Sequence, residues 1–309
     1  MASEGEHNVE QVSQAQLLAE AAQAAPGRQA SLWGDAWRRL VKNRLAVIGM
    51  IVASGLILMA IFAPLIAPYK EDEVISVDLA LATPSWYFPM GIDQNGRDVF
   101  SRLVYGARVS LLVGVLAQVI VLAIAVPIGS LSGFFGGRAD NYMMRGVDVV
   151  YAIPQLLLVL LIVNLRGPGM ANIFIAIGIT GWVTMARLIR GQMLSIREQE
   201  YVKASRVAGA GPGYIILRHM LPNSMTPIIV ALTFGIPVAI FIEAALSFVG
   251  VGIRPPQASW GQMVGVGQAY ILSVQHLMLF PSIMIALTML AFTFLGDGLR
   301  DALDVRLNE

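Results

Sequence analysis

Few residues in this sequence have the types and spacing that catalysis or metal binding requires. The chain contains no cysteine and three histidines, His7, His219 and His276. The missing thiols exclude disulfides, thiolate nucleophiles and cysteine-ligated metals. The histidines are too isolated in sequence to indicate a metal cluster. We therefore assign no catalytic residue and no metal ligand, and we expect the chain not to be an enzyme.

Carboxylates within apolar stretches are the next candidates, because an ion inside a membrane is costly and often functional. Glu243 lies roughly 25 Å along a helix that begins near Pro227, at ~1.5 Å per residue. It is a candidate gate or pathway residue, and the alternative is an interfacial carboxylate that reaches water. Asp148 follows Arg145 by three residues on one helical face, which predicts an ion pair between them.

A long polar stretch between apolar ones carries the richest pattern. Residues 187–226 contain QEYVKASRVAGAGPGYIILRHMLPNSMTP, which is far longer than a turn between adjacent helices requires. We predict a helix as far as Gly209, a tight turn, and a second helix from about Tyr214 to Leu221 before Pro222.

One face of the first of these helices has almost no side-chain bulk. Ala204 and Ala208 lie four residues apart, so another backbone can approach that face closely. Arg197, Lys203 and Arg206 stand around it. These cations fit either acidic groups on a cytoplasmic partner or anionic lipid headgroups, and the composition leaves both open.

The elements that carry these residues are apolar enough to cross a membrane. Of 309 residues, 56% are hydrophobic and 13% charged, and the mean hydropathy is +0.68. A span needs about 20 mostly apolar residues. The sequence therefore predicts an all-α polytopic fold with six transmembrane helices, at 45–68, 109–135, 147–165, 170–186, 227–250 and 272–295. Gly129, Gly133 and Gly137 match the small-xxx-small pattern that favours close helix packing.

Six spans place both termini on one side of the membrane. With the termini inside, that side holds most of the 21 Lys and Arg residues, as the positive-inside rule requires for an N-in, C-in topology. The outer side keeps Lys70, Arg97, Arg102, Arg108, Arg166 and Arg254. The chain then divides into a polar tail 1–30, a basic segment 31–44, a first span 45–68, an extracytoplasmic connection 69–108, a permease-like core 109–296 and a polar cytoplasmic tail 297–309.

The spacing within 187–226 resembles the loop motif of ABC-importer permeases, which reads EAA, three residues, Gly, nine residues, Ile, any residue, Leu-Pro. In this chain Lys203 replaces the glutamate and His219 the isoleucine, while the alanine, glycine and Leu-Pro positions stand. GIDQNGRDVFSRLVYGARVSLLVG, EAALSFVGVGIRPPQASWG and LGDGLRDALDVRL look like the dipeptide, oligopeptide and nickel branch of that family.

This resemblance implies a type I ABC-importer permease in the cytoplasmic membrane of a bacterium or archaeon. It implies a second homologous permease subunit, two cytoplasmic ATPase subunits that bind ATP and Mg, and an extracytoplasmic binding protein. No cofactor is expected on this chain itself. Di- and oligopeptides are the implied substrates, with nickel chelates, glutathione-like molecules or oligosaccharides as alternatives. The implied ATPase-coupling residues are Lys203, Ala204, Ser205, Arg206, Gly209, His219, Leu221 and Pro222.

Other classes of protein fit the sequence less well. It contains no GxxxxGK[ST] phosphate loop, so ATP is expected on other subunits. A stand-alone secondary transporter usually carries a coupling-ion site near the midplane, and an intramembrane hydrolase needs paired aspartates or an activated serine. Central carboxylates are scarce, and Asp297 has no evident partner. The net charge of +1 without a basic stripe makes membrane lipid, not nucleic acid, the expected contact.

Overall fold

The structure, a computed structural model, describes residues 32–167 and 169–303, so the predicted tail 1–30 and residues 304–309 lie outside it. Five of the described helices are long and apolar enough to cross a membrane. A pair of shorter helices, α6 (Gly137–Tyr151) and α7 (Gln155–Arg166), passes the same test only together and is bent by 77°. Counted as one span, the pair brings the described helices to the predicted six. The five long helices are α3 (Arg44–Ile61), α5 (Val99–Phe135), α8 (Met170–Arg197), α12 (Met225–Phe248) and α14 (His276–Leu303).

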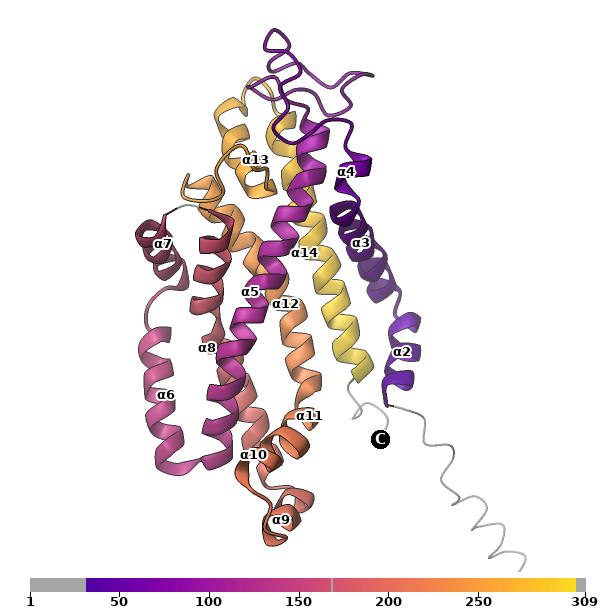
Figure 1. Cartoon of the computed structure of the whole chain (residues 1–309). Helices are drawn as coiled ribbons and strands as arrows, with labels where there is room; N and C mark the ends of the chain where they lie inside the picture. Colours follow the sequence, from indigo (N-terminus) through magenta and orange to yellow (C-terminus); the bar gives the residue numbers. More distant parts are fainter. Residues whose placement is uncertain (1–31, 168, 304–309) are drawn as a thin grey trace, which may run out of the picture.

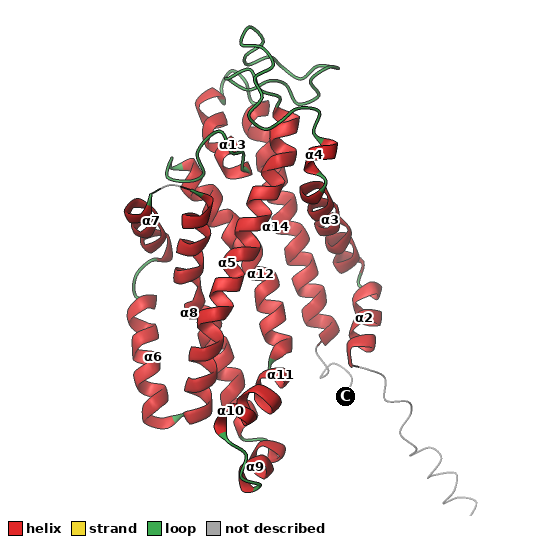
Figure 2. Ribbon diagram, viewed as in Figure 1, coloured by secondary structure: helices red, strands yellow, loops and turns green. Residues whose placement is uncertain are grey.

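The long helices run side by side, and short elements gather at the two ends of the bundle (Figure 1). Loop without regular structure is concentrated in the connection before α5, at the end opposite α9 (Figure 2). The short elements are α2 (Leu32–Lys42), α4 (Ala63–Ile66), α9 (Glu200–Val207), α10 (Pro212–Ile215), a π-helical turn η1 (Ile216–Met220), α11 (Leu221–Asn223), α13 (Trp260–Gly267) and a 3₁₀ turn η2 (Gln268–Tyr270).

Several helix boundaries differ from the prediction. Helix α5 begins at Val99, not at 109, because the Asp98 carboxylate accepts from the backbone nitrogen of Ser101 at 2.8 Å and caps the helix there. Helix α8 continues to Arg197, and α14 to Leu303. The predicted spans stopped at 186 and 295, shortly before Arg187 and Asp297, whereas both helices continue through these charged residues.

Both described ends of the chain lie at the same end of the bundle. Ala36 and Leu40 of α2 are buried in one cluster with Ala46 of α3 and Ala302 of α14. Helix α2 and the end of α14 are therefore neighbours, as Figure 1 shows. An even number of spans requires this arrangement, and the positive-inside rule makes this end cytoplasmic.

Glycines bring α5 and α8 into close contact. A Cβ on Gly129 would lie 2.6 Å from the carbonyl oxygen of Ala186, and one on Gly133 would lie 2.8 Å from that of Arg190. These distances leave no room for a side chain, so the two backbones meet directly. The predicted packing role is confirmed for both positions, while Gly137 faces open space.

The outer helix α13, which the sequence did not predict, is inserted between the spans. Its Trp260 is fully buried, and the indole nitrogen donates to the carbonyl oxygen of Leu103 at 2.9 Å. The Trp260 backbone nitrogen donates to the Ser110 hydroxyl at 3.2 Å. A Cβ on Gly106 would lie 3.1 Å from the indole ring, so α5 has a glycine where the ring packs.

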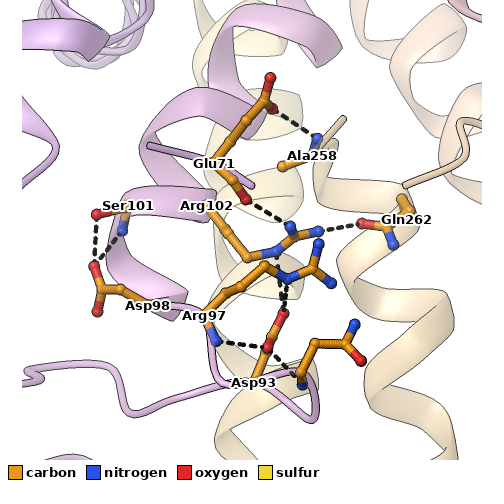
Figure 3. A network of polar contacts seen from close by, with 9 residues as sticks. Glu71, Asp93, Arg97, Asp98, Ser101, Arg102, Ala258 and Gln262 are labelled. Atoms are coloured by element: carbon orange, nitrogen blue, oxygen red, sulfur yellow. Dashed lines mark hydrogen bonds and ion pairs between the residues drawn. The ribbon is translucent and has the colours of Figure 1, made fainter. Parts of the chain in front are cut away.

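A buried polar network fastens the outer connection to α5 and α13 (Figure 3). The Asp93 carboxylate accepts from Arg97 Nε at 3.0 Å and lies 3.5 Å from Arg102 Nε. Arg102 also donates to the Glu71 carbonyl oxygen at 2.8 Å and to Gln262 Oε1 at 3.0 Å. Asp93 and both arginines are at most 5% exposed. The network therefore joins three segments that lie far apart in the sequence.

Asp93→Asn tests this network, because it removes a buried negative charge that faces two guanidinium groups. We expect the free energy of unfolding in detergent micelles to fall by about 3–5 kcal/mol, the usual effect of leaving a buried charge unpaired. Asp78→Asn, at an exposed position of the same connection, is the control, with an expected change within about 0.5 kcal/mol. Equal stabilities for the two variants would show that the network does not stabilise the fold.

Gly133→Ala tests the contact between α5 and α8. The added methyl group has no space, so we expect a loss of about 1–3 kcal/mol of stability, measured by thermal or denaturant unfolding in micelles. Gly191 of α8 is exposed, and a Cβ added there would meet no atom within 4 Å. Gly191→Ala is thus the matched control, expected to be neutral or to stabilise by about 0.5–1 kcal/mol. A stable Gly133→Ala variant would contradict the close contact.

Candidate functional site

The segment between α8 and α12 projects from the cytoplasmic end of the bundle, with α9 at its tip (Figure 1). The prediction of one continuous helix as far as Gly209 is wrong, because α8 ends at Arg197 and α9 begins at Glu200. The backbone of Gln199 is extended, with φ −69° and ψ 146°, and it turns the chain between the two helices. The turn makes α9 a separate short helix.

The predicted stop at Gly209 is confirmed. Its φ of +81° lies in the left-handed region, which favours glycine. The backbone nitrogen of Ala210 donates to the Ser205 carbonyl oxygen at 3.0 Å, and that of Ala208 donates to Ala204 at 2.9 Å. The bond from Ala210 to Ser205, together with that from the Gly209 backbone nitrogen to the Arg206 carbonyl oxygen at 3.0 Å, defines a Schellman cap. The end of α9 is therefore set by backbone hydrogen bonds around one glycine.

The second half of the loop is helical from Pro212 to Asn223, through α10, η1 and α11. Pro222 does not end this segment as predicted, because it lies in the first turn of α11, where a backbone N–H is not needed. The π-helical turn keeps Ile216 and Met220 buried. The loop is consequently a compact helical hairpin.

The loop exposes the small-residue face that the sequence predicted. Ala204, Ala208 and Gly209 are all exposed. The same loop also exposes large apolar side chains, with Val207 90% and Leu217 67% exposed. Sequence reasoning missed these two, although an isolated valine beside a small-residue face is a detectable signal. Val207 and Leu217 therefore add apolar area to the exposed side of this loop.

The predicted basic residues contact groups of this chain. Lys203 Nζ lies 3.4 Å from Glu198 Oε2, and the Arg206 guanidinium lies 5.0 Å from the centre of the Phe134 ring. Arg197 donates to Glu198 Oε1 at 3.3 Å, and this hydrogen bond holds the pKa of the Glu198 carboxyl below its usual range. These contacts orient the cations, while their pairing with a partner or with lipid stays a prediction.

His219 helps to close the loop on itself. Its ring lies 5.4 Å from that of Tyr214 in an edge-on arrangement and 6.5 Å from that of Tyr201 on α9. The Ser205 hydroxyl donates to the Tyr201 carbonyl oxygen at 2.8 Å. Leu221 packs at the edge of the adjacent buried cluster. His219, Ser205 and Leu221 therefore lie in the same hairpin, and their role in coupling stays a prediction.

The inner side of α9 is anchored in the bundle. Val202 is fully buried and belongs to one apolar cluster with Phe134 of α5, Met193 of α8 and Ile215 of α10. Because α9 follows α8 after two residues, it is held by both packing and chain connection. Helix α9 therefore has a buried side that is packed against the bundle and an exposed side with small residues. A partner bound to the exposed side could displace the helix and the residues packed beneath it.

Ion pairs join α6 to the cytoplasmic end of α8. Asp140 accepts from Arg190 Nε and Nη2, both at 2.6 Å, and also from the Ser132 hydroxyl. Asp148 accepts from Arg187 at 2.6 Å. The predicted pair of Asp148 with Arg145 is therefore wrong, because α6 folds back along α8 and brings Arg187 opposite Asp148.

Glu243 lies inside the protein and does not reach water. It is fully buried, and the hydroxyls of Ser247 and Ser259 each donate to its Oε1 at 2.8 Å. Ser259 also caps α13 by accepting from the backbone nitrogen of Gln262 at 3.0 Å. The alternative of a carboxylate that reaches water is wrong, since this buried carboxylate joins α12 to the start of α13. Its role as a gate stays a prediction.

Comparison with known proteins identifies the family. A model described as "binding-protein-dependent transport system inner membrane component" matches residues 125–309. A second, described as the N-terminal TM domain of oligopeptide transport permease C, matches residues 31–84. The first match includes the whole loop, α8 and the cytoplasmic end of α5, and the second includes α2, α3 and α4.

Curated relatives match almost the full length of the chain. The dipeptide transport system permease protein DppC of Bacillus subtilis is 47% identical over 88% of this chain and 85% of its own. The oligopeptide permease OppC of the same organism is 43% identical, over 90% and 91%. The glutathione transport permease GsiD of Pectobacterium atrosepticum is 38% identical, over 89% and 91%.

The fold is also similar to that of a solved transporter. A chain of the inward-facing MetNI methionine ABC transporter superposes with a TM-score of 0.56 at 20% identity, covering 66% of this chain and 96% of that one. This likeness shows the fold of an ABC-importer permease. Together with the two family models and the relatives, it shows that the chain belongs to the binding-protein-dependent transport system inner membrane component family and is an ABC-transporter permease subunit.

Proposed function

We propose that this chain is one of two membrane subunits of an ATP-driven importer of di- and oligopeptides in the cytoplasmic membrane of a bacterium. The observation that carries the proposal is helix α9, whose outer face at Ala204 and Ala208 is bare and exposed while Val202 is buried. In this proposal an ATPase subunit grips α9, and the hairpin 200–223 is the coupling loop.

The contacts of α9 suggest how a displacement would reach the membrane spans. Val202 belongs to the apolar cluster that contains Phe134, near the end of α5. The Arg206 guanidinium lies over the Phe134 ring. The ion pair between Asp140 and Arg190 joins α6 to α8. The cytoplasmic ends of α5, α6 and α8 would then move as one body when α9 moves, which is the kind of rigid-body rearrangement that alternating access requires.

The substrate and the partners are inferred from the relatives. Those cited above are named for dipeptide, oligopeptide and glutathione transport, and all three substrates consist of amino acids joined by amide bonds. The family description names a binding protein. Because the sequence has no phosphate loop, we assign ATP and Mg to two separate ATPase subunits and expect a second permease subunit to complete the channel. A stand-alone secondary transporter does not fit membership of a binding-protein-dependent family.

Ala204→Trp tests the coupling loop, because it adds bulk to an exposed helical face without backbone strain. We expect binding-protein-stimulated ATP hydrolysis by the reconstituted complex to fall by about tenfold or more, since each 1.4 kcal/mol of lost interaction changes a rate tenfold. Unfolding of the purified chain should be unchanged. Ala204→Ser, which keeps the face small, is the matched control and should retain stimulation. Full stimulation of ATP hydrolysis in the tryptophan variant would show that α9 does not contact the ATPase subunit.

Uptake measurements in proteoliposomes test the transport class. With both permeases, the ATPases and the binding protein present, we expect labelled dipeptide to accumulate only when ATP is supplied on the side of α9. A proton or sodium gradient alone should drive none, because the energy enters through the ATPases. Gradient-driven uptake without ATP would establish a secondary transporter instead. ATP-driven uptake of a nickel chelate but not of dipeptide would overturn the substrate part of the proposal.

A further inference from the structure

Two cavities adjoin between the membrane spans. The larger, of about 250 Å³, lies between α5, α8 and α12, and the start of α7 reaches it. The smaller, of about 130 Å³, lies beside the break between α6 and α7. Gln155, Gly181 and Thr184 line both cavities. The two cavities therefore lie side by side, and together we call them the amide groove after the glutamine side chains that line them.

The polar groups of the amide groove are uncharged. Gln118 of α5 donates from its side-chain nitrogen to the Gly235 carbonyl oxygen at 2.9 Å. Gln155 of α7 donates to the Thr180 hydroxyl at 3.4 Å, and Thr184 is exposed. A carboxamide has two N–H donors and two acceptor lone pairs, so each glutamine keeps capacity beyond these bonds. Among the residues that the structure describes, no Asp, Glu, Lys, Arg or His lines either cavity.

The break between α6 and α7 borders the amide groove. Residues 152–154 are exposed and non-helical, and they fall within the apolar stretch 147–165. Ile153 and Pro154 line the smaller cavity. Irregular backbone at membrane depth persists only where protein buries it or where it lines a water-filled space, because lipid leaves its polar groups unsatisfied. On this chain alone these residues are exposed, so their backbone groups are expected to face the groove or the second permease subunit and not lipid.

One side of the groove is open on this chain. Val238 of α12, which lines the larger cavity, is 52% exposed, and Thr184 is exposed on α8. A half-channel needs such an open side, since the second permease subunit closes the path. The bond from Gln118 to Gly235 alone would fit ordinary helix packing. Packing within the chain does not explain Thr184, whose side chain is exposed and lines both cavities.

We propose that the amide groove is this chain's share of the substrate path. In it Gln118, Gln155 and Thr184 contact the passing peptide through its backbone amides and not through the charges of its side chains. Glutamine amides and a hydroxyl can exchange hydrogen bonds with any peptide bond, so peptides of different side-chain charge pass the same wall. This inference rests on the proposed import function and adds the route and the recognised group.

The absence of cysteine from the chain permits a direct test with Thr184→Cys. The variant is assembled with the second permease, the ATPases and the binding protein, and treated with 2-sulfonatoethyl methanethiosulfonate, a charged reagent that reacts with thiols in water. Mass spectrometry of this chain measures the modification separately from any cysteine of the partners. We expect modification of the assembled complex, and we expect it to slow several-fold when dipeptide and ATP are supplied together.

Ile179→Cys is the control on the same helix. Ile179 is 43% exposed and lines neither cavity, so its thiol should face lipid and stay unmodified. The groove assignment is overturned if Cys at position 184 is not modified, or if it is modified at a rate that peptide does not change. Binding-protein-stimulated ATP hydrolysis, measured in the same preparations, shows whether each variant has assembled.

Charge substitutions at the same position give a second, independent readout. Thr184→Lys and Thr184→Asp should change the uptake ratio of alanyl-lysine to alanyl-glutamate in opposite directions, by about tenfold between the variants, because a fixed charge acts strongly in a narrow path. Gly146→Lys and Gly146→Asp, on an exposed face of α6 with open space, are the controls and should leave the ratio unchanged. If wild type takes up no peptide, the proposed function fails. If wild type transports and the ratio does not respond at position 184, only the groove assignment fails.

Discussion

Helices α5 and α8 meet backbone to backbone because Gly129 and Gly133 leave no side chain between them. Both helices continue past the membrane, since the 37 residues of α5 extend about 55 Å at ~1.5 Å per residue, against a hydrocarbon core of about 30 Å. Near the cytoplasmic end of α8, the ion pair of Asp140 with Arg190 joins α8 to α6. The proposed coupling loop follows α8 directly, so its position depends on this contact as well as on the packing of Val202.

Charge is concentrated at the two ends of the molecule. The outer end holds Asp93 with Arg97 and Arg102, and the inner end holds the pairs of Asp140 and Asp148. The cavities between these ends are lined by neutral groups. Burying an ion in a membrane is costly unless it is paired, so paired charges stabilise the ends while the middle stays neutral. An uncharged middle also suits a path for peptides of differing charge.

Parts of the hairpin 200–223 were predictable because they depend on local chain geometry. The stop at Gly209 follows from the freedom of glycine to adopt φ +81°, and the bare face at Ala204 and Ala208 follows from helical spacing. The end of the hairpin at Asn223 was not predictable, because proline is compatible with a first helical turn as well as with a helix end. The exposure of Leu217 was also missed, since an apolar residue in a short helix is normally expected inside.

The sequence by itself determined the membrane class, the number and approximate place of the spans, the side of the termini and the family motif of the loop. Each of these follows from hydropathy, charge asymmetry or spacing along the chain. Only the tertiary structure decided that Asp148 pairs with Arg187, that Glu243 is buried under α13, and that Gln118 and Gln155 line one groove. These facts depend on which helices become neighbours and at what rotation, and periodicity within one helix does not contain that information.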